Sequence, residues 1–289
     1  MGNISIKAHA KINLSLSITG RRDDGYHLMD SLVVFADIAD QISIEKDHED
    51  SLTITGSQAD GLNTTDLSQN ILITALDAYR TALNWDENFA LTLEKNIPVA
   101  AGIGGGSSDA AAILTALNRL NSTPCSDDKL AEIGLQIGAD LPVCLKQYQS
   151  SQWRMRGIGE DLTPMSFHDV TAAGLILVNP MVGVSTKDVF GRLDYAALSP
   201  SNDMNEGADL MAWLERGNDL ADPAMAIEDK IKQQLDGLST LKDRDGYLHH
   251  GMSGSGATCF ALFENAHQAI LAHDHIKQQM AWSWAGKVR

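Results

Sequence analysis

The stretch PVAAGIGGGSSDAAAILTAL, residues 98–117, is a glycine-rich segment that leads directly into a strong helix-forming sequence. Glycine loses the most conformational freedom on folding, so a run of glycines is expected where a backbone must approach another group closely. Ser107, Ser108 and Asp109 favour the first turn of a helix, and we expect that helix to cover residues 107–121. Unpaired N–H groups and a partial positive charge at a helix N-terminus attract anions. The segment predicts a phosphate-binding loop, against the alternative of a flexible loop before a packed alanine helix.

Neither of the two common phosphate-binding fingerprints fits this loop. Gly102, Gly104 and Gly105 do not form the dinucleotide pattern, and no acidic residue ends a strand about 20 residues further on. No Gly-Lys-Ser/Thr sequence follows, so the P-loop signature is also missing. These absences argue against a nicotinamide-dependent oxidoreductase and leave a phosphate loop of another kind.

The composition restricts the class of partner. The chain has 289 residues, which suggests two domains, and a formal net charge of −16 from 22 basic and 38 acidic residues. Nucleic acids and anionic membranes both favour basic proteins, so we expect neither as a partner, while a small anionic ligand needs only a local positive site. No secretory signal or membrane span is recognisable, and the three cysteines are typical of reduced thiols. The expected location is the cytoplasm.

The periodicity of apolar residues predicts a mixture of strands and helices without strict alternation, hence an α+β fold. We expect strands over residues 11–18, 30–46, 51–56, 89–98, 174–180 and 282–288, a strand–turn–strand over 247–263, and helices over 68–83 (with Ser68 as a candidate N-cap), 107–121, 126–138, 203–215, 223–238 and 265–280. The segment 160–171 is expected to be a loop containing the domain boundary, which gives domains 1–163 and 164–289. No internal repeat is present.

Three further segments carry polar or small residues at positions that suggest chemistry. In AKINLSL (10–16), Lys11 and Asn13 lie on the same face of a strand. In IGADLPVCL (137–145), Asp140 follows a helix that we expect to end at Gly138. MSGSGATCF (252–260) is a second small-residue turn that enters a strand. Each signal alone is weak, because an isolated Lys or Asp is usually a solvated charge.

Taken together, the N-terminal strand motif, the glycine loop and the C-terminal turn resemble the three hallmarks of the GHMP kinase superfamily, in the same order. Within that superfamily the chain resembles the 4-diphosphocytidyl-2-C-methyl-D-erythritol kinases, and the resemblance covers nearly all of it. The segments that carry this resemblance are AHAKINLSLSITGRRDDGYHLMDSLV, GIGGGSSDAAA, IGADLPVCL, RGIGEDL, NPMVGVSTKDVF and GNDL. Departures are modest: Ile103 stands where Leu is common, Ser255 where Thr is frequent, and YQSSQWRM (148–155) is unlike the usual sequence there.

The resemblance implies a two-domain GHMP kinase fold: an N-terminal ATP-side α+β domain, a ferredoxin-like C-terminal domain, and an active site in the cleft between them. It implies a cytoplasmic kinase that transfers the γ-phosphoryl group of ATP to the 2-hydroxyl of the cytidine-diphosphate-linked methylerythritol. This reaction belongs to the non-mevalonate route to isoprenoid precursors. Mg²⁺ is expected with ATP, but no pair of carboxylates is recognisable as its ligands.

The resemblance also implies the site residues. Asp140 would be the catalytic base and Lys11 its electrostatic partner. Substrate-binding residues would be Asn13, Tyr26, His27 and Phe190, the last three around the cytosine. The residues implied for ATP, with Lys95, Asn96 and Val99 on the adenine side, are Lys95, Asn96, Pro98, Val99, Ala100, Ala101, Gly102, Ile103, Gly104, Gly105, Gly106, Ser107 and Ser108.

Two rival hypotheses remain from the sequence. A homoserine or mevalonate-type kinase would share the loop but lack a cytosine pocket. A non-catalytic nucleotide-binding protein on the same fold would be expected to lack Lys11 or Asp140, and both are present. The oligomeric state is left open.

Overall fold

The chain folds into two compact units that do not follow a single cut in the sequence. This computed structural model describes residues 3–62, 69–99, 101–195, 198 and 207–289. Unit 1 consists of Met1–Ala10, Ile38–Val99 and Gly104–Gln149, and unit 2 of Lys11–Asp37, Ala100–Ile103 and Ser150–Arg289. Two long strands, β1 (Asn3–Arg21) and β2 (His27–Asp47), therefore contribute residues to both units. The boundary after residue 163 stays a prediction.

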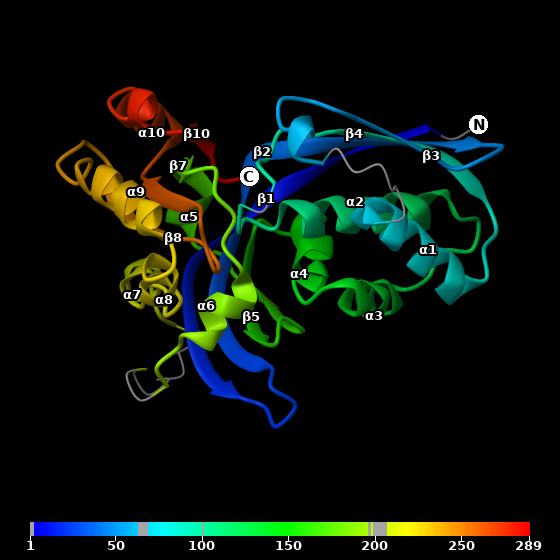
Figure 1. Cartoon of the computed structure of the whole chain (residues 1–289), viewed down its shortest axis with the longest axis horizontal. Helices are drawn as coiled ribbons and strands as arrows, with labels where there is room; N and C mark the ends of the chain where they lie inside the picture. Colours follow the sequence, from blue (N-terminus) through cyan, green and yellow to red (C-terminus); the bar gives the residue numbers. More distant parts are fainter. Residues whose placement is uncertain (1–2, 63–68, 100, 196–197, 199–206) are drawn as a thin grey trace. The chain divides into compact units, whose positions relative to one another are not determined.

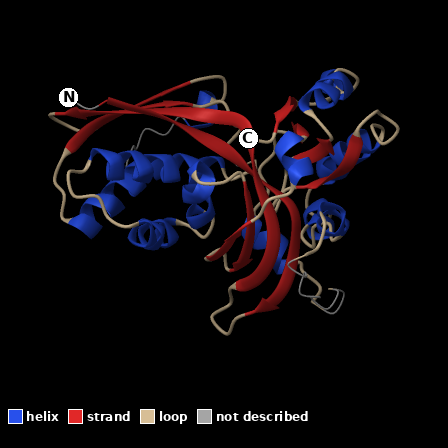
Figure 2. Ribbon diagram, turned by 180° about the vertical axis from the view of Figure 1, so that it is seen from behind, coloured by secondary structure: helices blue, strands red, loops and turns tan. Residues whose placement is uncertain are grey.

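Unit 1 combines a mixed sheet with helices that lie on one face of it (Figures 1 and 2). Its further elements are β3 (Ser51–Thr55), η1 (Ala59–Leu62), α1 (Ile71–Leu83), β4 (Asn88–Glu94), α2 (Gly105–Leu120), α3 (Asp127–Ile137), α4 (Leu141–Leu145) and η3 (Lys146–Tyr148). Strand β4 is paired on both sides: antiparallel with the second half of β2 and parallel with β3. Alternation of buried and exposed residues along β4 directs its apolar side chains into the core.

The helix after the glycine loop begins earlier than the sequence predicts. Helix α2 starts at Gly105, and its N-cap is Gly104, whose φ of 64° lies in the left-handed region that glycine adopts easily. No side chain caps this helix, so Ser107 is not a cap but part of the first turn. The following alanines are buried, which lets α2 pack closely in unit 1. At α1 the observed N-cap is Asn70, and Ser68 lies outside the described residues.

Unit 2 contains a four-stranded antiparallel sheet in the order β10-β7-β9-β8. Its elements beyond β1 and β2 are β5 (Gln152–Gly157), β6 (Asp161–Pro164), α5 (His168–Ala172), β7 (Gly174–Asn179), α6 (Thr186–Gly191), α7 (Leu210–Glu215), α8 (Ala221–Met225), α9 (Asp229–Ser239), β8 (Tyr247–Met252), β9 (Cys259–Phe263), α10 (Ala266–His273), η4 (Lys277–Gln279) and β10 (Trp282–Lys287). Helices α9 and α10 bury apolar side chains in a shared core with strands β7 and β9. This β–α–β–β–α–β arrangement confirms the ferredoxin-like prediction.

Several predicted elements of unit 2 have different bounds. The predicted loop 160–171 contains β6 and the first residues of α5. The helix predicted over 223–238 is interrupted, because Glu228 is extended (φ −136°, ψ 103°) and its side chain caps α9. Of the helix predicted over 203–215, the described part begins at Leu210 as α7, and residues 203–206 lie outside the described residues. The chain was not expected to form β5 at all.

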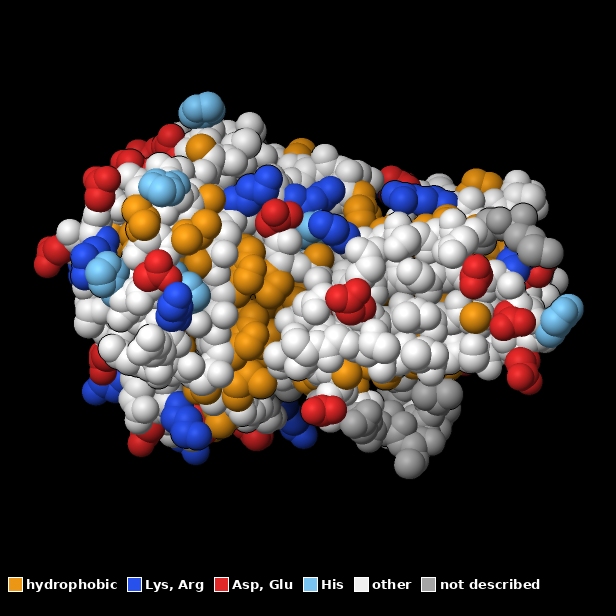
Figure 3. Space-filling view, turned by 90° about the horizontal axis from the view of Figure 1, so that it is seen from above, with side chains coloured by type: hydrophobic (Ala, Val, Ile, Leu, Met, Phe, Trp, Pro, Cys, Tyr) orange, Lys and Arg blue, Asp and Glu red, His pale blue; other side chains and the backbone are white. Residues whose placement is uncertain are grey.

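The cysteines agree with the sequence analysis, which expected reduced thiols. Cys125, Cys144 and Cys259 are all unbridged, and burial raises the pKa of the Cys259 thiol. Acidic and basic side chains are both scattered over the face drawn in Figure 3. Among the helices that the structure describes, none is long and apolar enough to cross a membrane.

Candidate active site

In unit 2 the first part of the glycine loop packs directly against the C-terminal small-residue turn. Gly102 has a φ of 72°, and a Cβ at this position would overlap the backbone carbonyl of Gly256. Thr258 fixes the contact, because its backbone amide and its hydroxyl donate to the carbonyl of Ala101 at 3.1 and 2.6 Å. Two glycine motifs that are more than 150 residues apart in the sequence are thereby held together (Ala101 and Thr258 are 157 residues apart).

The N-terminal strand motif is hydrogen-bonded to both the glycine loop and the C-terminal turn. The amide of Lys11 donates to the carbonyl of Ile103 at 3.0 Å, and the amide of Asn13 donates to the hydroxyl of Ser253 at 3.0 Å. Lys11 and Asn13 are buried, with exposures of 3% and 1%. Asn13 Nδ2 donates to the hydroxyl of Ser31, while Asn13 Oδ1 is buried without a hydrogen-bond partner in the described part of the chain. Three motifs that sequence reasoning identified separately therefore meet in unit 2.

The second part of the loop belongs to unit 1 and forms the first turn of α2. Gly104, Gly105 and Gly106 place no side chain of their own on this turn, where Gly104 and Gly105 are half-buried and Gly106 is exposed. The amide of Ser108 is the first to bond within the helix, to the carbonyl of Gly104 at 2.7 Å. The N–H groups ahead of it have no intrahelical acceptor, which suits them to an anion. Ser107 is half-buried, whereas Ser108 is buried with its hydroxyl 3.5 Å from Cys144 Sγ.

Asp140 occupies the N-cap position of α4 in unit 1, where it is half-buried. Its place after Gly138 is the one expected, and Gly138 ends α3. Lys11 belongs to unit 2, so the pairing of Lys11 with Asp140 stays a prediction.

Lys95 is the predicted adenine-side residue whose surroundings are the most distinctive. It is 2% exposed, and its ammonium is ion-paired with Asp40 and, at 2.8 Å, with Asp109. Burial by itself lowers the pKa of Lys95, but the two carboxylates outweigh it and hold that pKa above its ordinary value. Burial also raises the pKa of Asp109 to about 8; Lys95 opposes this rise and Asp40 adds to it. The Lys95 ammonium is therefore paired with two carboxyl groups of its own unit, unit 1.

The other residues on the predicted adenine side have varied exposure. Asn96 is half-buried, and its backbone amide donates to Asp40 Oδ1 at 2.6 Å. Pro98 is buried, whereas Val99 is 38% exposed. Ala100 lies outside the described residues. Their contacts with a nucleotide stay predictions.

The predicted cytosine residues in unit 2 include an aromatic cluster. The rings of His27 and Phe190 are stacked with centroids 4.4 Å apart and planes inclined by 25°, and His27 is also stacked on Tyr195 at 5.9 Å. Burial, together with the positive charge of Arg21, lowers the pKa of His27, so its ring is neutral near pH 7. Tyr26 is 55% exposed and takes no part in this stack. These rings, except Tyr26, line a cavity of about 590 Å³ that also contains Arg21 and Lys187.

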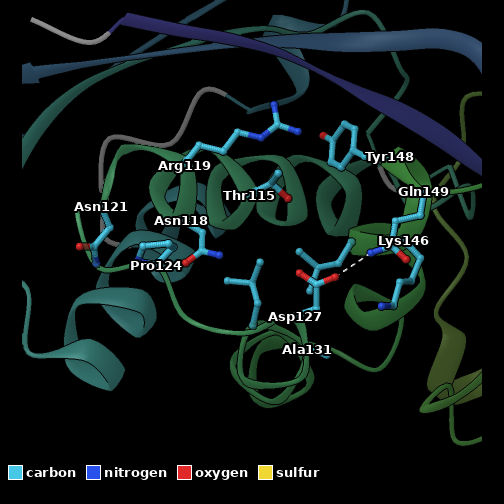
Figure 4. A pocket seen from close by; sticks show the side chains of 12 residues that line it. Thr115, Asn118, Arg119, Asn121, Pro124, Asp127, Ala131, Lys146, Tyr148 and Gln149 are labelled. Atoms are coloured by element: carbon cyan, nitrogen blue, oxygen red, sulfur yellow. Dashed lines mark hydrogen bonds between the residues drawn. The ribbon is translucent and has the colours of Figure 1, made fainter.

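A second cavity, of about 530 Å³, lies in unit 1 between α2, α3 and the α4–η3 segment (Figure 4). None of the predicted site residues lines it. Asn118 in its wall bonds to the backbone of Cys125, and Asp127 accepts from Gln149 at 2.8 Å. The polar groups of this cavity are thus largely committed to holding the surrounding chain together.

Sequence reasoning missed three residues that shape the site. Asp40 accepts from the amides just before the glycine loop, Thr258 anchors Ala101, and Tyr195 extends the stack on His27. Asp40 offered a signal, since an acid between apolar residues of a strand is buried only when it has partners. Among the described residues, no group of three or more His, Cys, Asp or Glu side chains is placed to hold a metal ion.

Family models match two segments of the chain: the GHMP kinases N terminal domain matches residues 70–147, and the GHMP kinases C terminal domain matches residues 195–281. A protein of Brucella abortus named 4-diphosphocytidyl-2-C-methyl-D-erythritol kinase is 46% identical over 270 residues, which cover 91% of this chain and 87% of the relative. A Mesorhizobium japonicum protein of the same name is 40% identical and covers 96% of this chain and 93% of the relative.

Solved structures agree with these relatives. The chain is similar to a crystal structure of 4-(cytidine 5'-diphospho)-2C-methyl-D-erythritol kinase, with a TM-score of 0.79, 28% identity and 99% coverage of both chains. Homoserine kinase from Cytophaga hutchinsonii has a TM-score of 0.66 at 17% identity, with 100% of this chain and 95% of that chain covered. At that identity the likeness shows a common fold and nothing about the substrate.

Proposed function

Since the chain belongs to the 4-diphosphocytidyl-2-C-methyl-D-erythritol kinase family of the GHMP kinases, we propose that it transfers the γ-phosphoryl group of ATP to the 2-hydroxyl of 4-diphosphocytidyl-2-C-methyl-D-erythritol. The observation that carries this proposal is the meeting of the three kinase motifs in unit 2, at Lys11, Ala101 and Thr258. The reaction serves the non-mevalonate route to isoprenoid precursors. We further propose the cytoplasm as its location, because the enzyme needs ATP and its cysteines are unbridged.

ATP phosphates bind at the first turn of α2. The amides of Gly105, Gly106 and Ser107 supply donors for the phosphate oxygens. The positive end of the helix dipole adds attraction for the triphosphate. Because phosphoryl transfer asks a protein mainly for positioning and charge stabilisation, this turn does a large part of the work.

Asp140 acts as the general base and Lys11 as its electrostatic partner. An ionised carboxylate near the acceptor hydroxyl takes its proton as the bond to phosphorus forms, and a nearby ammonium keeps that carboxylate ionised. Burial of Lys11 supports this role, because an ammonium is costly to bury without an anionic or polar partner. Asn13 lies two residues from Lys11 on the same strand, and its buried Oδ1 is an acceptor without a hydrogen-bond partner in the described residues.

The cytidine end of the acceptor binds at Tyr26, His27 and Phe190. Stacking on aromatic side chains suits a flat base and contributes about 1–3 kcal/mol per base. The close stack of His27 on Phe190 places two of the three residues in one cavity wall. In this proposal Tyr26 approaches from its exposed position, and the adenine of ATP lies beside Asn96 and Val99.

Mg²⁺ enters this account as part of the nucleotide substrate. Mg²⁺ commonly retains several waters and binds substrate phosphates with few protein ligands, which fits a site without a carboxylate cluster in the described residues. Ser107, the half-buried serine of the first turn, is the hydroxyl available to it. The ion would neutralise charge on the phosphate oxygens during transfer.

Asp140→Asn tests the proposed chemistry, because the amide keeps the shape of the carboxyl but cannot accept a proton. Turnover should fall about 10²- to 10⁴-fold, the usual contribution of a general base, while ATP binding should change little. Asp128→Asn, on the exposed first turn of α3, is the matched control and should have wild-type turnover. Undiminished turnover of Asp140→Asn would rule out Asp140 as the base.

A further inference from the structure

The ammonium of Lys95 lies next to Gly105, the residue at which the glycine loop ends and helix α2 begins. A Cβ added to Gly105 would be 3.3 Å from Lys95 Nζ and 3.3 Å from Cγ2 of Ile97. No side chain therefore separates the first residue of α2 from this ammonium. Lys95 itself lies just after β4, ahead of the loop.

The Lys95 backbone is also fixed. Its amide donates to the carbonyl of Thr55 at 2.7 Å, and its carbonyl accepts from the amide of Gln58 at 2.9 Å. Main chain and side chain of Lys95 are thus both engaged by groups of unit 1. An ammonium held between two buried carboxyl groups is a rigid element, since moving it away from either one would leave a buried polar group without its hydrogen bond.

The two carboxylates hold opposite sides of the loop. Asp40 Oδ1 accepts from the amides of Asn96 and Ile97 at 2.6 and 2.9 Å, which fixes the chain before the loop. Asp109 lies one residue beyond Ser108, inside the first turns of α2, and is 2% exposed. Lys95 joins the two carboxylates and so connects the entry of the loop to its exit.

We propose that Lys95 is a positioning residue: through Asp40 and Asp109 it holds the two ends of the glycine loop at a fixed separation and thereby sets the positions of the amides that bind ATP phosphates. This inference rests on the proposed function of the loop. It gives Lys95 a different task from lining the adenine. Small displacements of a binding group have large effects, since an error of about 1 Å in a reacting geometry can cost about 100-fold in rate.

Lys95→Met tests the inference, because methionine fills similar volume without the charge. The KM for ATP should rise about tenfold or more while the KM for the cytidine-bearing acceptor changes less than about twofold. Arg80→Met is the matched control. Arg80 also joins parts of unit 1, through a bidentate pair with Asp50 and a bond to the carbonyl of Glu87, but it acts at the other end of β4. Its KM for ATP should stay within about twofold of wild type.

A second pair of variants covers the case in which Lys95→Met does not fold. Asp109→Ala cuts the link at α2 but leaves Lys95 paired with Asp40, and it should also raise the KM for ATP selectively. Asp109→Asn keeps an oxygen to accept from Lys95 and should recover most of that loss. Equal increases in both KM values, or an ATP KM that Asp109→Ala leaves unchanged, would overturn the inference.

Hydrogen exchange separates this inference from the proposed function. In folded Lys95→Met or Asp109→Ala protein, without any substrate, the amides of residues 101–108 should exchange faster than in wild type. The Arg80→Met variant should leave that exchange unchanged. If the wild-type protein failed to phosphorylate the proposed acceptor, this readout would still test the positioning role. Unchanged exchange in both loop variants would refute it.

Discussion

Two buried ion clusters, one in each unit, solve opposite problems of charge balance. In unit 1 two carboxylates, Asp40 and Asp109, share the single ammonium of Lys95. In unit 2 two guanidinium groups, Arg154 and Arg216, share the single carboxylate of Asp30. The first cluster carries a surplus of negative groups and the second a surplus of positive ones.

The two surpluses are relieved in different ways. A carboxyl can bind a proton, and burial accordingly raises the pKa of Asp109 to about 8. A guanidinium cannot lose its proton in a protein, so unit 2 must keep its surplus charge in contact with water or with aromatic rings. The side chain of Arg216 is 14% exposed, and the Cζ atoms of both guanidiniums lie 5.3 Å from the ring centroid of Trp213. A buried cluster with surplus carboxyl groups can therefore be closed to water, whereas one with surplus guanidinium groups needs contact with water or aromatic rings.

The largest effect on stability is expected when Lys95, the cation shared by Asp40 and Asp109 in unit 1, is removed. Lys95→Met leaves the buried Asp40–Asp109 pair without a cation to balance its negative charge, and it should lower the free energy of unfolding by about 3–5 kcal/mol at pH 7. Urea denaturation followed by circular dichroism measures this value. A loss below about 1 kcal/mol, the size expected of a surface pair, would break the comparison.

The cluster of unit 2 should tolerate the loss of one cation better. Arg154→Met removes the bidentate partner of Asp30 but leaves Arg216 at 2.8 Å from Asp30 Oδ2. The unfolding free energy should therefore fall by about 1–3 kcal/mol, less than for Lys95→Met under the same conditions. A larger loss of unfolding free energy in Arg154→Met than in Lys95→Met would show that the sign of the surplus charge does not determine how well a cluster tolerates the loss of a cation.

The smallest effects, on the pH dependence of stability, should have opposite signs in the two clusters. The folded-state pKa of Asp109 is raised, so the folded protein binds the extra proton and stability falls as pH rises from about 4 towards 8. Burial alone would raise the pKa of Asp30, but the hydrogen bonds from Arg154 and Arg216 hold it below its ordinary value. The stability that Asp30 contributes is fully present above the ordinary pKa of an aspartate and is lost as pH falls through the lowered pKa of the folded state.

Unfolding free energies measured from pH 3 to pH 9 for two variants check these signs. Asp109→Asn should flatten the curve on its alkaline side, and Asp30→Asn should flatten it on its acidic side. A wild-type curve that Asp109→Asn leaves unchanged above pH 5 would mean that this carboxyl does not carry the proton.

Much of the fold was readable from local patterns. Alternation of apolar residues predicted β4, and a short apolar run predicted β7 as a buried strand. Helical spacing of apolar residues predicted α1, α3 and α10, although the expected cap of α1 was Ser68 and the observed one is Asn70. Strand β5 was missed because it contains Arg154, and a charged residue usually indicates an exposed position. Arg154 can be buried in the strand because Asp30, which is distant in the sequence, neutralises its charge. Asp30 is 124 residues away in the sequence.

The candidate site shows the same limit. Glycines at residues 102 and 104–106 indicated a close approach of backbone, and the structure shows Gly102 against Gly256. Sequence alone could not pair Lys95 with Asp40, 55 residues away, because a lysine near a phosphate loop is equally plausible as a ligand of the nucleotide. Long-range ion pairs depend on the packing of whole elements, which no local pattern encodes.

One assay identifies the acceptor that this enzyme phosphorylates. Purified protein with ATP and Mg²⁺ is offered 4-diphosphocytidyl-2-C-methyl-D-erythritol, homoserine and mevalonate separately, and phosphorylated product is quantified for each. The account predicts ATP-dependent phosphorylation of the cytidine-bearing acceptor and no comparable product from the other two. Faster phosphorylation of homoserine or mevalonate, or none of the cytidine-bearing acceptor, would contradict it.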